Sequence, residues 1–254
     1  MTDTQVTLAQ IDNYGPWTTT PAPRREPDLQ ALQASLYADL AEQVGAHDGY
    51  VFYTRFDNMV AVTNGLDRAA HERIQETVRN RYPVTLSLSV AAERTPAAAL
   101  STASAQLQAA GSAQDVDRRE VLAGAVDADA GPVEIAHFDV VDATEKYTDG
   151  TGAYETFLRI EEGYAALARH LHATHDALAF FVGGDNVIAV CPRLDPAAYA
   201  GAMDHVREET GLDLRVGVGR GPTACDAGLA AKQRLEECRE DQVRVGVPAT
   251  VSGD

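Results

Sequence analysis

The chain has 254 residues, of which 45% are hydrophobic, so it can bury a large core as one domain or as two of ordinary size. This composition excludes an intrinsically disordered chain. The formal net charge of −17 at pH 7 excludes non-specific binding to DNA, RNA or an anionic membrane, because all three would repel the protein. We therefore expect no nucleic acid and no membrane among its partners.

The first half of the chain begins with a predicted strand that ends in an aspartate. The segment "VTLAQIDNYGPWTTT", from Val6, shows apolar alternation and then Asp12. Leucines at helical spacing in "DLQALQASLYADLAEQV" predict a long helix that Asp28 would cap. The segment "GYVFYTRFDNMVAVTNG" predicts a hairpin with Asp57 and Asn58 at its turn. A further strand is predicted in "VTLSLSV".

The second half repeats this order. "VEIAHFDVVDATEKY" places Asp139 where the first half has Asp12, and "ALAFFVGGDNVIAVCPR" repeats the Asp-Asn turn with Asp185. The Asp-to-Asp spacing is 45 residues in the first half and 46 in the second. Matched segments in the same order predict a tandem duplication with its joint in "AVDADAGP". We expect one domain over 1–126 and another over 127–254, the second with a short acidic tail.

These elements predict an α+β fold in which a ferredoxin-like or palm β-α-β-β-α-β domain occurs twice. The second half has predicted strands at about 133–140, 177–183, 187–191 and 212–219, and predicted helices at about 150–174, 195–210 and 223–240. The expected sheet is antiparallel, with helices on one face. In this topology the end of the first strand lies beside the tip of the central hairpin. Asp12 is therefore expected to meet Asp57, and Asp139 to meet Asp185.

Two carboxylates that the fold brings together repel one another unless a cation lies between them. Mg²⁺ suits such a pair, because it prefers hard oxygen ligands and completes its shell with water and substrate phosphate. Two or more such ions can bridge a triphosphate, polarise its phosphorus and activate water. Candidate metal ligands are therefore Asp12, Asp57, Asp139 and Asp185. A single Asp-Asn turn is usually only a turn, but the pair occurs twice, which favours a metal site.

Small residues accompany the second aspartate pair. Gly183 and Gly184 would let phosphates approach the backbone without an intervening side chain. The backbone N–H groups from Val141 to Thr144, after the first strand of this half, would form a phosphate cradle. The second half therefore offers a triphosphate both carboxylates and open backbone.

Several segments resemble known families. "FDVVDAT" is similar to the first strand of class III nucleotidyl cyclases, and "VGGDN" is similar to the signature hairpin of diguanylate cyclases. The chain as a whole more closely resembles the archaeal GTP cyclohydrolase III family, also called GTP cyclohydrolase IIa. This resemblance extends over nearly all of the chain except its acidic tail, and it rests on the segments "QIDNYGPWT", "PRRE", "DLQALQASLYADL", "VFYTRFDN", "IQETVRNRYP", "GSAQD" and "FFVGGDN".

The resemblance implies two palm domains, GTP as the substrate and Mg²⁺ as the cofactor. It implies hydrolysis of the guanine imidazole ring with retention of the formyl group, which gives 2-amino-5-formylamino-6-ribosylamino-4(3H)-pyrimidinone 5′-phosphate and two phosphates. That product feeds riboflavin and deazaflavin synthesis. The family also suggests a homo-oligomer. Its archaeal origin is consistent with the dispersed acidic surplus, which resembles that of proteins from salt-loving organisms.

The segment "NYGPWTTTP" is rich in turn residues and aromatics, and we expect Asn13, Tyr14 and Gly15 to contact the nucleotide. Asn13 is a candidate to read guanine, and Tyr14 or Trp17 to stack on it. Packing of these aromatic rings in the core is the alternative interpretation.

Basic residues are scarce in this acidic chain, so three arginines are candidate phosphate contacts: Arg24, Arg25 and Arg55. Ordinary surface ion pairing is the alternative for Arg24 and Arg25, and the alternative for Arg55 is that it marks a half that gave up metal binding. His137 precedes Asp139 by two residues and shares its strand face, which makes it a candidate general base. A histidine that only packs in the core is the simpler interpretation.

No zinc is expected. The three cysteines have no C-x-x-C spacing, and His170, His172 and His175 do not share one helix face. The cysteines are most simply free thiols in a reducing cytoplasm. The first residues show neither a basic nor an apolar leader region, and no run of 18 apolar residues occurs, so a cytoplasmic protein is expected.

Two other functions remain open from the sequence: a nucleotidyl or diguanylate cyclase, and a non-catalytic nucleotide-sensing module. Between the halves, the first has bulky Arg55 and Phe56 before its hairpin aspartate, where the second has two glycines. We therefore expect Asp139 and Asp185 to act catalytically by holding the metals. The first half is expected to contribute base recognition and positive charge.

Overall fold

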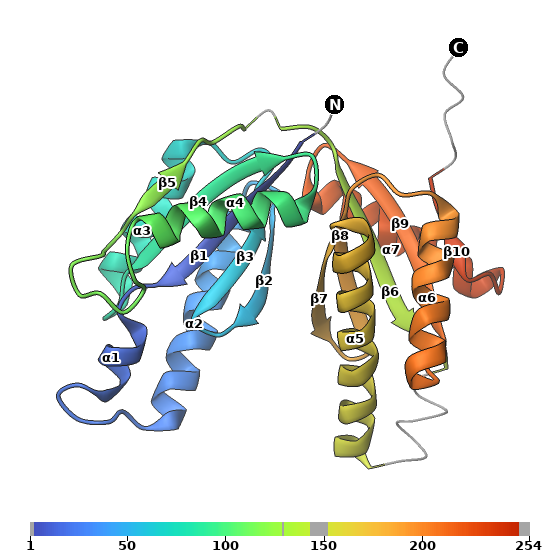
Figure 1. The fold of residues 1–254 in the computed structure, drawn as a ribbon, viewed down its shortest axis with the longest axis horizontal. Coiled ribbons are helices and arrows are strands. Elements are labelled where there is room, and N and C mark those ends of the chain that lie inside the picture. Colours follow the sequence, from blue (N-terminus) through green and yellow to red (C-terminus); the bar gives the residue numbers. More distant parts are fainter. Residues whose placement is uncertain (1–2, 129, 143–151, 249–254) are drawn as a thin grey trace. The chain divides into compact units, whose positions relative to one another are not determined.

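A computed structural model describes residues 3–128, 130–142 and 152–248 of the chain (Figure 1). The chain forms two compact units. The first contains Met1–Pro132 with Thr223–Cys225, and the second contains Val133–Pro222 with Asp226–Asp254. The main division thus falls between residues 132 and 133, whereas the sequence pattern placed it between 126 and 127.

The first unit is a five-stranded sheet with the strand order β2-β3-β1-β4-β5. Its central strand β1 pairs antiparallel with β3 on one side and β4 on the other, and β5 joins β4 in parallel. The elements in chain order are β1 (Thr4–Ile11), α1 (Tyr14–Thr19), α2 (Glu26–Gly45), β2 (Tyr50–Arg55), β3 (Asn58–Val62), α3 (Arg68–Arg81), β4 (Leu86–Glu93), α4 (Pro96–Ala109) and β5 (Leu122–Gly124).

The second unit repeats this topology with the order β10-β9-β6-β8-β7. Here β6 is central, pairs antiparallel with β8 and β9, and β10 joins β9 in parallel. Its elements are β6 (Val133–Val140), α5 (Ala153–His175), β7 (Leu178–Gly183), β8 (Asn186–Cys191), α6 (Pro196–Thr210), β9 (Leu214–Gly221), α7 (Ala224–Glu240) and β10 (Val245–Gly246). The predicted fold class, a duplicated α+β palm-like domain, is confirmed.

Two details of the predicted sheet are wrong. The sheets are mixed rather than antiparallel, because the short edge strands β5 and β10 each add in parallel. Helices also cover both faces of each sheet, as Figure 1 shows for α4 opposite α2 and α3. In the second unit α7 approaches closely because β9 has glycines on that face. A Cβ atom added to Gly217 would lie 2.2 Å from a carbonyl oxygen of α7, so a side chain there would exclude the helix.

The core of each unit lies between the sheet and its first two long helices. In the first unit the buried stripe of α2, Leu36, Leu40 and Val44, packs against Ile11 and Leu86 of the sheet. Burial at i, i+4 and i+8 is the reason this segment forms an amphipathic helix. The expected cap is wrong: α2 begins at Glu26, so Asp28 lies in its first turn rather than before it.

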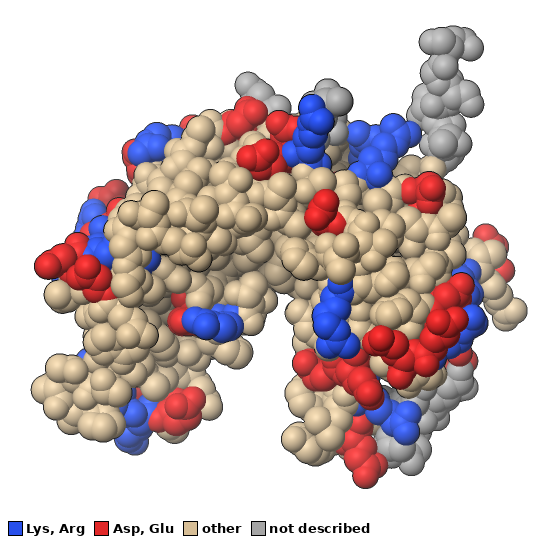
Figure 2. Space-filling model, viewed as in Figure 1, with Lys and Arg blue, Asp and Glu red and all other residues tan. Residues whose placement is uncertain are grey.

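Side-chain caps mark the start of three other helices. Asp67, Thr95 and Asp195 each accept a hydrogen bond from the backbone N–H three residues later, at the beginning of α3, α4 and α6 respectively. Over the surface of the second unit, acidic side chains gather on α5 and α6 with arginines between them (Figure 2). Two arginines there, Arg207 and Arg244, share the carboxylate of Asp204. In the residues that the structure describes, no helix is long and apolar enough to cross a membrane.

Candidate active site

The second unit brings its two aspartates together. In the antiparallel pairing of β6 with β8, Asp139 lies opposite Asn186. Asp185 is the hairpin residue just before Asn186, so it lies beside Asp139. Asp139 is almost wholly buried, at 5% exposure. Burial raises the pKa of Asp185 above its ordinary value, and the neighbouring Asp139 carboxylate raises it further. The structure therefore holds two carboxyl groups close enough to disfavour the charge on one of them.

An arginine of α7 partly neutralises this pair. Nη2 of Arg239 lies 2.8 Å from Oδ1 of Asp139, and its Nε donates to Oδ2 over 3.4 Å. Arg239 remains 38% exposed and also pairs with Glu236. Arg239 thus offsets part of the charge of Asp139 and also acts to lower the pKa of Asp185.

A histidine and an amide orient the hairpin. Asn186 donates from Nδ2 to Asp185 over 3.2 Å, which turns its Oδ1 towards His137. Nε2 of His137 lies 3.0 Å from that oxygen and is assigned as the donor, since an amide oxygen only accepts. Burial lowers the pKa of His137, so its ring is neutral at neutral pH. His137 therefore fixes the hairpin beside β6 and is not simply packed in the core.

The two hairpin glycines have backbone conformations that favour glycine. Gly183 has φ +106° and Gly184 has φ +64°, and a register shift in the hairpin falls between Phe181 and Gly183. A Cβ atom at Gly183 would meet nothing within 4 Å, so the backbone there has open space beside it. In the expected phosphate cradle, Val141 and Asp142 are described, while residues 143 and 144 lie outside the described ranges.

The first unit treats its aspartates differently. Oδ1 of Asp12 accepts hydrogen bonds from Ser87 (2.6 Å) and Arg118 (3.2 Å). Oδ2 accepts from Thr85 (2.8 Å) and from the backbone N–H of Glu120 (2.9 Å). The Asp12–Arg118 ion pair is fully inside the protein, with side chains 1% and 3% exposed. Four donors thus fill the acceptor sites of the Asp12 carboxylate, which leaves Asp12 no free lone pair for a metal ion.

Asp57 lies on the hairpin turn, and its backbone carbonyl accepts a hydrogen bond from the N–H of Ile11 at the end of β1. Its side chain pairs with exposed Arg55 over 2.7 Å rather than with Asp12. The two carboxylates of the first half thus have separate arginine partners, and the expected meeting of their side chains does not appear among the described interactions.

The strand register also corrects the match between the halves. The sequence pattern aligned Asp12 with Asp139. In the sheets, however, Gln10 lies opposite Asn58 as Asp139 lies opposite Asn186. Gln10 is therefore the structural counterpart of Asp139, and Asp12 lies two residues beyond it. The second unit alone carries a carboxylate at this strand position.

The family model and the curated relatives name the same family. Residues 6–252 match the family model described as GTP cyclohydrolase III. Over 244 residues the chain is 61% identical to "GTP cyclohydrolase III 1" of Halobacterium salinarum, which covers 94% of this chain and 96% of that protein. It is 60% identical over 252 residues to "GTP cyclohydrolase III" of Natronomonas pharaonis, with 96% and 98% covered.

The chain belongs to the GTP cyclohydrolase III family.

Among solved structures, the coiled coil and GGDEF domain of DgcB from Caulobacter crescentus, in complex with c-di-GMP, is similar to part of this family member. The TM-score is 0.39 and the identity 15%, over 46% of this chain and 70% of that one.

The remaining predicted contacts of this GTP cyclohydrolase III family member lie on the first unit. Tyr14 and Trp17 of α1 stack on one another with ring centroids 6.0 Å apart and pack against the core. Arg24 lies over the Trp17 ring at 3.9 Å, and Arg25 forms an exposed bidentate pair with Asp28. Gly15 is exposed. The structure thus shows local partners for both arginines and for both aromatic rings.

Asn13 differs from these neighbours. It has a left-handed conformation with φ 51°, and its Oδ1 is buried with no hydrogen-bond partner within the described part of the chain. An unsatisfied buried acceptor is uncommon, so this oxygen stays a candidate contact for a donor on a ligand.

Sequence reasoning missed three residues of these sites: Arg118, Arg239 and Gln10. Arg118 and Arg239 lie 106 and 100 residues from the aspartates they bind, so no local pattern links them. Gln10 was overlooked because its role depends on strand register. For Arg239, the only signal in the sequence was its place in the last turn of a predicted helix.

Proposed function

We propose that this protein is a Mg²⁺-dependent GTP cyclohydrolase. It would open the guanine imidazole ring with retention of the formyl group and release two phosphates, giving 2-amino-5-formylamino-6-ribosylamino-4(3H)-pyrimidinone 5′-phosphate for riboflavin and deazaflavin synthesis. The observation that carries the proposal is the family match over residues 6–252. The acidic pair of the second unit supports it, because such a pair suits a metal that binds phosphates.

The residues of the second unit fit Mg²⁺. Asp139 and Asp185 supply hard oxygen ligands side by side, and the raised pKa of Asp185 reflects a repulsion that a cation would relieve. The open space beside Gly183 leaves room for substrate phosphates. When bound, Mg²⁺ would neutralise phosphate charge and lower the pKa of a bound water. We therefore propose Asp139 and Asp185 as the metal ligands, and an internal structural role for Asp12.

The other residues of this site hold the ligands in place. Arg239 fixes the carboxylate of Asp139 through two hydrogen bonds. His137 and Asn186 tie the hairpin to β6 and so set the position of Asp185. These contacts would hold the proposed metal ligands in position.

Incubation of the protein with GTP and Mg²⁺ tests the proposal. We expect loss of purine absorbance and release of two phosphates for each GTP, with Asp185→Asn inactive under the same conditions. Pyrophosphate with a cyclic nucleotide would instead identify a cyclase. Nucleotide binding without turnover would identify a sensing module, and either result would contradict the proposed reaction.

Two further properties are part of the proposal. We place the enzyme in the cytoplasm, because Cys191, Cys225 and Cys238 are all free thiols. Its family resemblance favours a homo-oligomer, and light scattering after size-exclusion chromatography would contradict this if it gave the mass of a single chain.

A further inference from the structure

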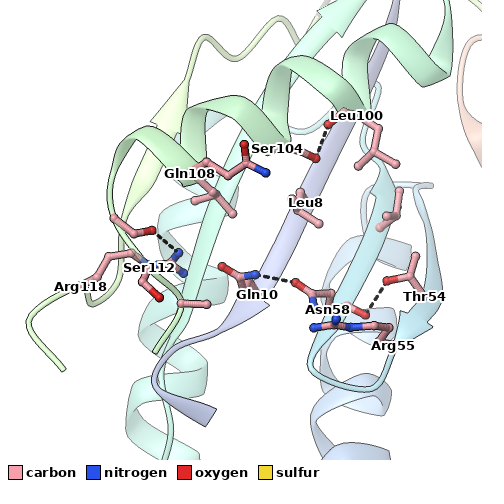
Figure 3. A pocket seen from close by; sticks show the side chains of 14 residues that line it. Leu8, Gln10, Thr54, Arg55, Asn58, Leu100, Ser104, Gln108, Ser112 and Arg118 are labelled. Carbon is pink, nitrogen blue, oxygen red and sulfur yellow. Dashed lines mark hydrogen bonds between the residues drawn. The ribbon is translucent and has the colours of Figure 1, made fainter. Parts of the chain in front are cut away.

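The first unit contains a cavity of about 640 Å³ on the sheet face that α4 covers (Figure 3). Helix α4 packs mainly on β4 and β1, so the hairpin β2–β3 forms the opposite wall of the cavity. This volume lies within the range of pockets that bind small molecules. The described lining contains no aspartate or glutamate, so the cavity does not offer a metal ion the hard carboxylate ligands it prefers.

The walls of the cavity are apolar. Leu8 and Val60 contribute one apolar surface from the sheet, and Leu100 and Leu107 contribute another from α4. Leu100, Ser104 and Leu107 follow one another at i, i+4 and i+7, so one helix face lines the cavity. A flat ring system can bury its faces against such surfaces while its edge meets the polar groups of the lining.

The two arginines of the lining are already engaged. Arg118 donates from Nη2 to Asp12 and from Nη1 to the carbonyl of Gly111, and its Nε is enclosed by the protein. Arg55 donates two hydrogen bonds to Asp57 at the exposed hairpin tip. Neither guanidinium therefore offers the cavity an uncompensated charge. A neutral ligand that forms hydrogen bonds fits this environment.

A chain of hydrogen bonds fixes which end of the Gln10 amide is free. The Asp57 carboxylate only accepts, so Asn58 donates to it from Nδ2 over 3.0 Å. The Oδ1 atom of Asn58 then accepts from Nε2 of Gln10 over 2.8 Å. Gln10 therefore directs its Oε1 away from Asn58, as Figure 3 shows, and within the described interactions this oxygen accepts nothing. The strand wall thus presents an acceptor that requires a donor from the ligand.

Gln108 supplies a second amide from the helix wall. It is exposed on α4 at the edge of the cavity, and its side chain forms no hydrogen bond among the described interactions. This amide can therefore donate from Nε2 and accept at Oε1. The lining hydroxyls of Ser104 and Thr54 instead donate to backbone carbonyls. Together the two glutamines offer a ligand two acceptors and a donor.

An exocyclic amino group beside a ring nitrogen complements these groups. The amino group donates two hydrogens, one to each glutamine oxygen, and the ring nitrogen accepts from Nε2 of Gln108. Adenine carries this pair at N6 and N7, and a glutamine amide matches that edge with two hydrogen bonds. The same edge of guanine, O6 and N7, offers only acceptors and would leave the oxygen of Gln10 without a donor.

We propose that this cavity binds an adenine base, with the leucines against its faces and with Gln10 and Gln108 at its amino edge. The sugar would leave through the mouth, where Thr54 and Ser112 are exposed. The base belongs either to free adenosine or to an adenine nucleotide, and the chemistry of the cavity is the same for both. All of these contacts come from the first unit, so this binding is independent of the acidic pair of the second unit.

A cavity-filling variant with a matched control tests whether the ligand binds in this cavity. Ser104→Phe places a ring in the cavity, whereas Ser101→Phe adds the same ring to an exposed position of α4 that does not line it. Adenosine binding to the full chain would be measured by calorimetry in EDTA, so that no metal contributes. We expect wild type and Ser101→Phe to bind adenosine alike, and Ser104→Phe to bind it at least about tenfold more weakly.

A second pair of variants tests the amide and keeps the experiment valid if Ser104→Phe fails to fold. Gln108→Met removes the donor and acceptor from an exposed side chain, so the fold is retained. Gln114→Met is the control, because Gln114 is also exposed but does not line the cavity. We expect adenosine binding to weaken about tenfold in Gln108→Met, the effect of roughly one hydrogen bond, and to stay unchanged in Gln114→Met.

Two further ligands test the choice of base and its source. Inosine differs from adenosine at C6, where an oxygen replaces the amino group, and we expect it to bind wild type at least about tenfold more weakly. AMP binding tighter than adenosine assigns the cavity to a nucleotide, and equal binding assigns it to the nucleoside. The proposal is overturned if wild type does not bind adenosine at about 1 mM, if inosine binds as tightly, or if Ser104→Phe and Gln108→Met both bind adenosine like wild type.

Discussion

The same strand position carries different chemistry in the two units. Opposite the hairpin asparagine, the second unit has Asp139 and the first has Gln10. An exposed arginine, Arg239, partners the carboxylate of Asp139 in the second unit, while Asp12, two residues beyond Gln10 in the first unit, is buried against Arg118. The duplicated fold thus supplies one framework, and a few side chains decide which charges and hydrogen bonds it holds at this strand position. The comparison teaches that repeated sequence segments need not carry repeated sites.

The largest predicted effect concerns the two arginines. Arg118→Met would leave the Asp12 carboxylate buried without a cation, and we expect a loss of about 3–5 kcal/mol in the free energy of unfolding. Arg239→Met removes a partner that is 38% exposed, and we expect a loss below about 1 kcal/mol. Denaturant unfolding of both variants checks this difference. Equal losses would show that the two ion pairs are not distinguished by burial.

The second prediction concerns turnover. Asp139→Ala and Asp185→Ala should each lower kcat at least about a hundredfold, since metal charge stabilisation is worth several kcal/mol. Asp57→Ala is the matched control in the other hairpin and should have a smaller effect, because Asp57 is paired with Arg55 at the surface. Steady-state kinetics at saturating Mg²⁺ measure both. An effect of Asp57→Ala on kcat as large as that of Asp185→Ala would refute the assignment.

A third prediction uses pH to probe the first unit. Burial lowers the pKa of His71, whose Nδ1 donates to Asp67 and whose Nε2 accepts from Thr7. Below the ordinary histidine pKa of about 6.5, the unfolded state therefore binds more protons than the folded state. The contribution of neutral His71 to the free energy of unfolding is complete above about pH 6.5 and declines as the pH falls below it. Urea unfolding should show a greater loss between about pH 7.5 and pH 5.5 for wild type than for His71→Gln. Identical losses in both proteins would contradict this role.

The smallest effect is one that both units share. The charge of −17 is spread along the chain, so screening should stabilise the fold as a whole. We expect a higher melting temperature in about 2 M KCl than in about 0.1 M KCl. A melting temperature that is equal or higher in the dilute buffer would be inconsistent with self-repulsion.

Much of the fold follows from local patterns, and the exceptions have physical causes. Apolar periodicity and turn residues predicted the long helices and the paired hairpins. The edge strands β5 and β10 are only three and two residues long, too short to produce a periodic signal. Helix α4 is rich in alanine, so its sequence does not show which sheet face it covers.

The candidate site was only partly predictable for a related reason. Asp139 and Asp185 meet because topology places a strand end beside a hairpin tip, which sequence reasoning can anticipate. The match of Asp12 to Asp139 failed because strand register is set by pairing across the sheet, and a slip of two residues preserves the alternation of apolar side chains. Arg118 and Arg239 contact aspartates in distant segments of the chain, so no local spacing in the sequence predicts these contacts.

Direct metal binding tests the central claim, that the acidic pair of the second unit holds the divalent cations. Mn²⁺ would replace Mg²⁺ as the probe, and electron paramagnetic resonance would measure bound metal in the presence of a non-hydrolysable GTP analogue. We predict that wild type and Asp57→Asn bind Mn²⁺ with the same affinity and that Asp185→Asn binds it at least about tenfold more weakly. Loss of binding in Asp57→Asn with binding retained in Asp185→Asn would contradict the account.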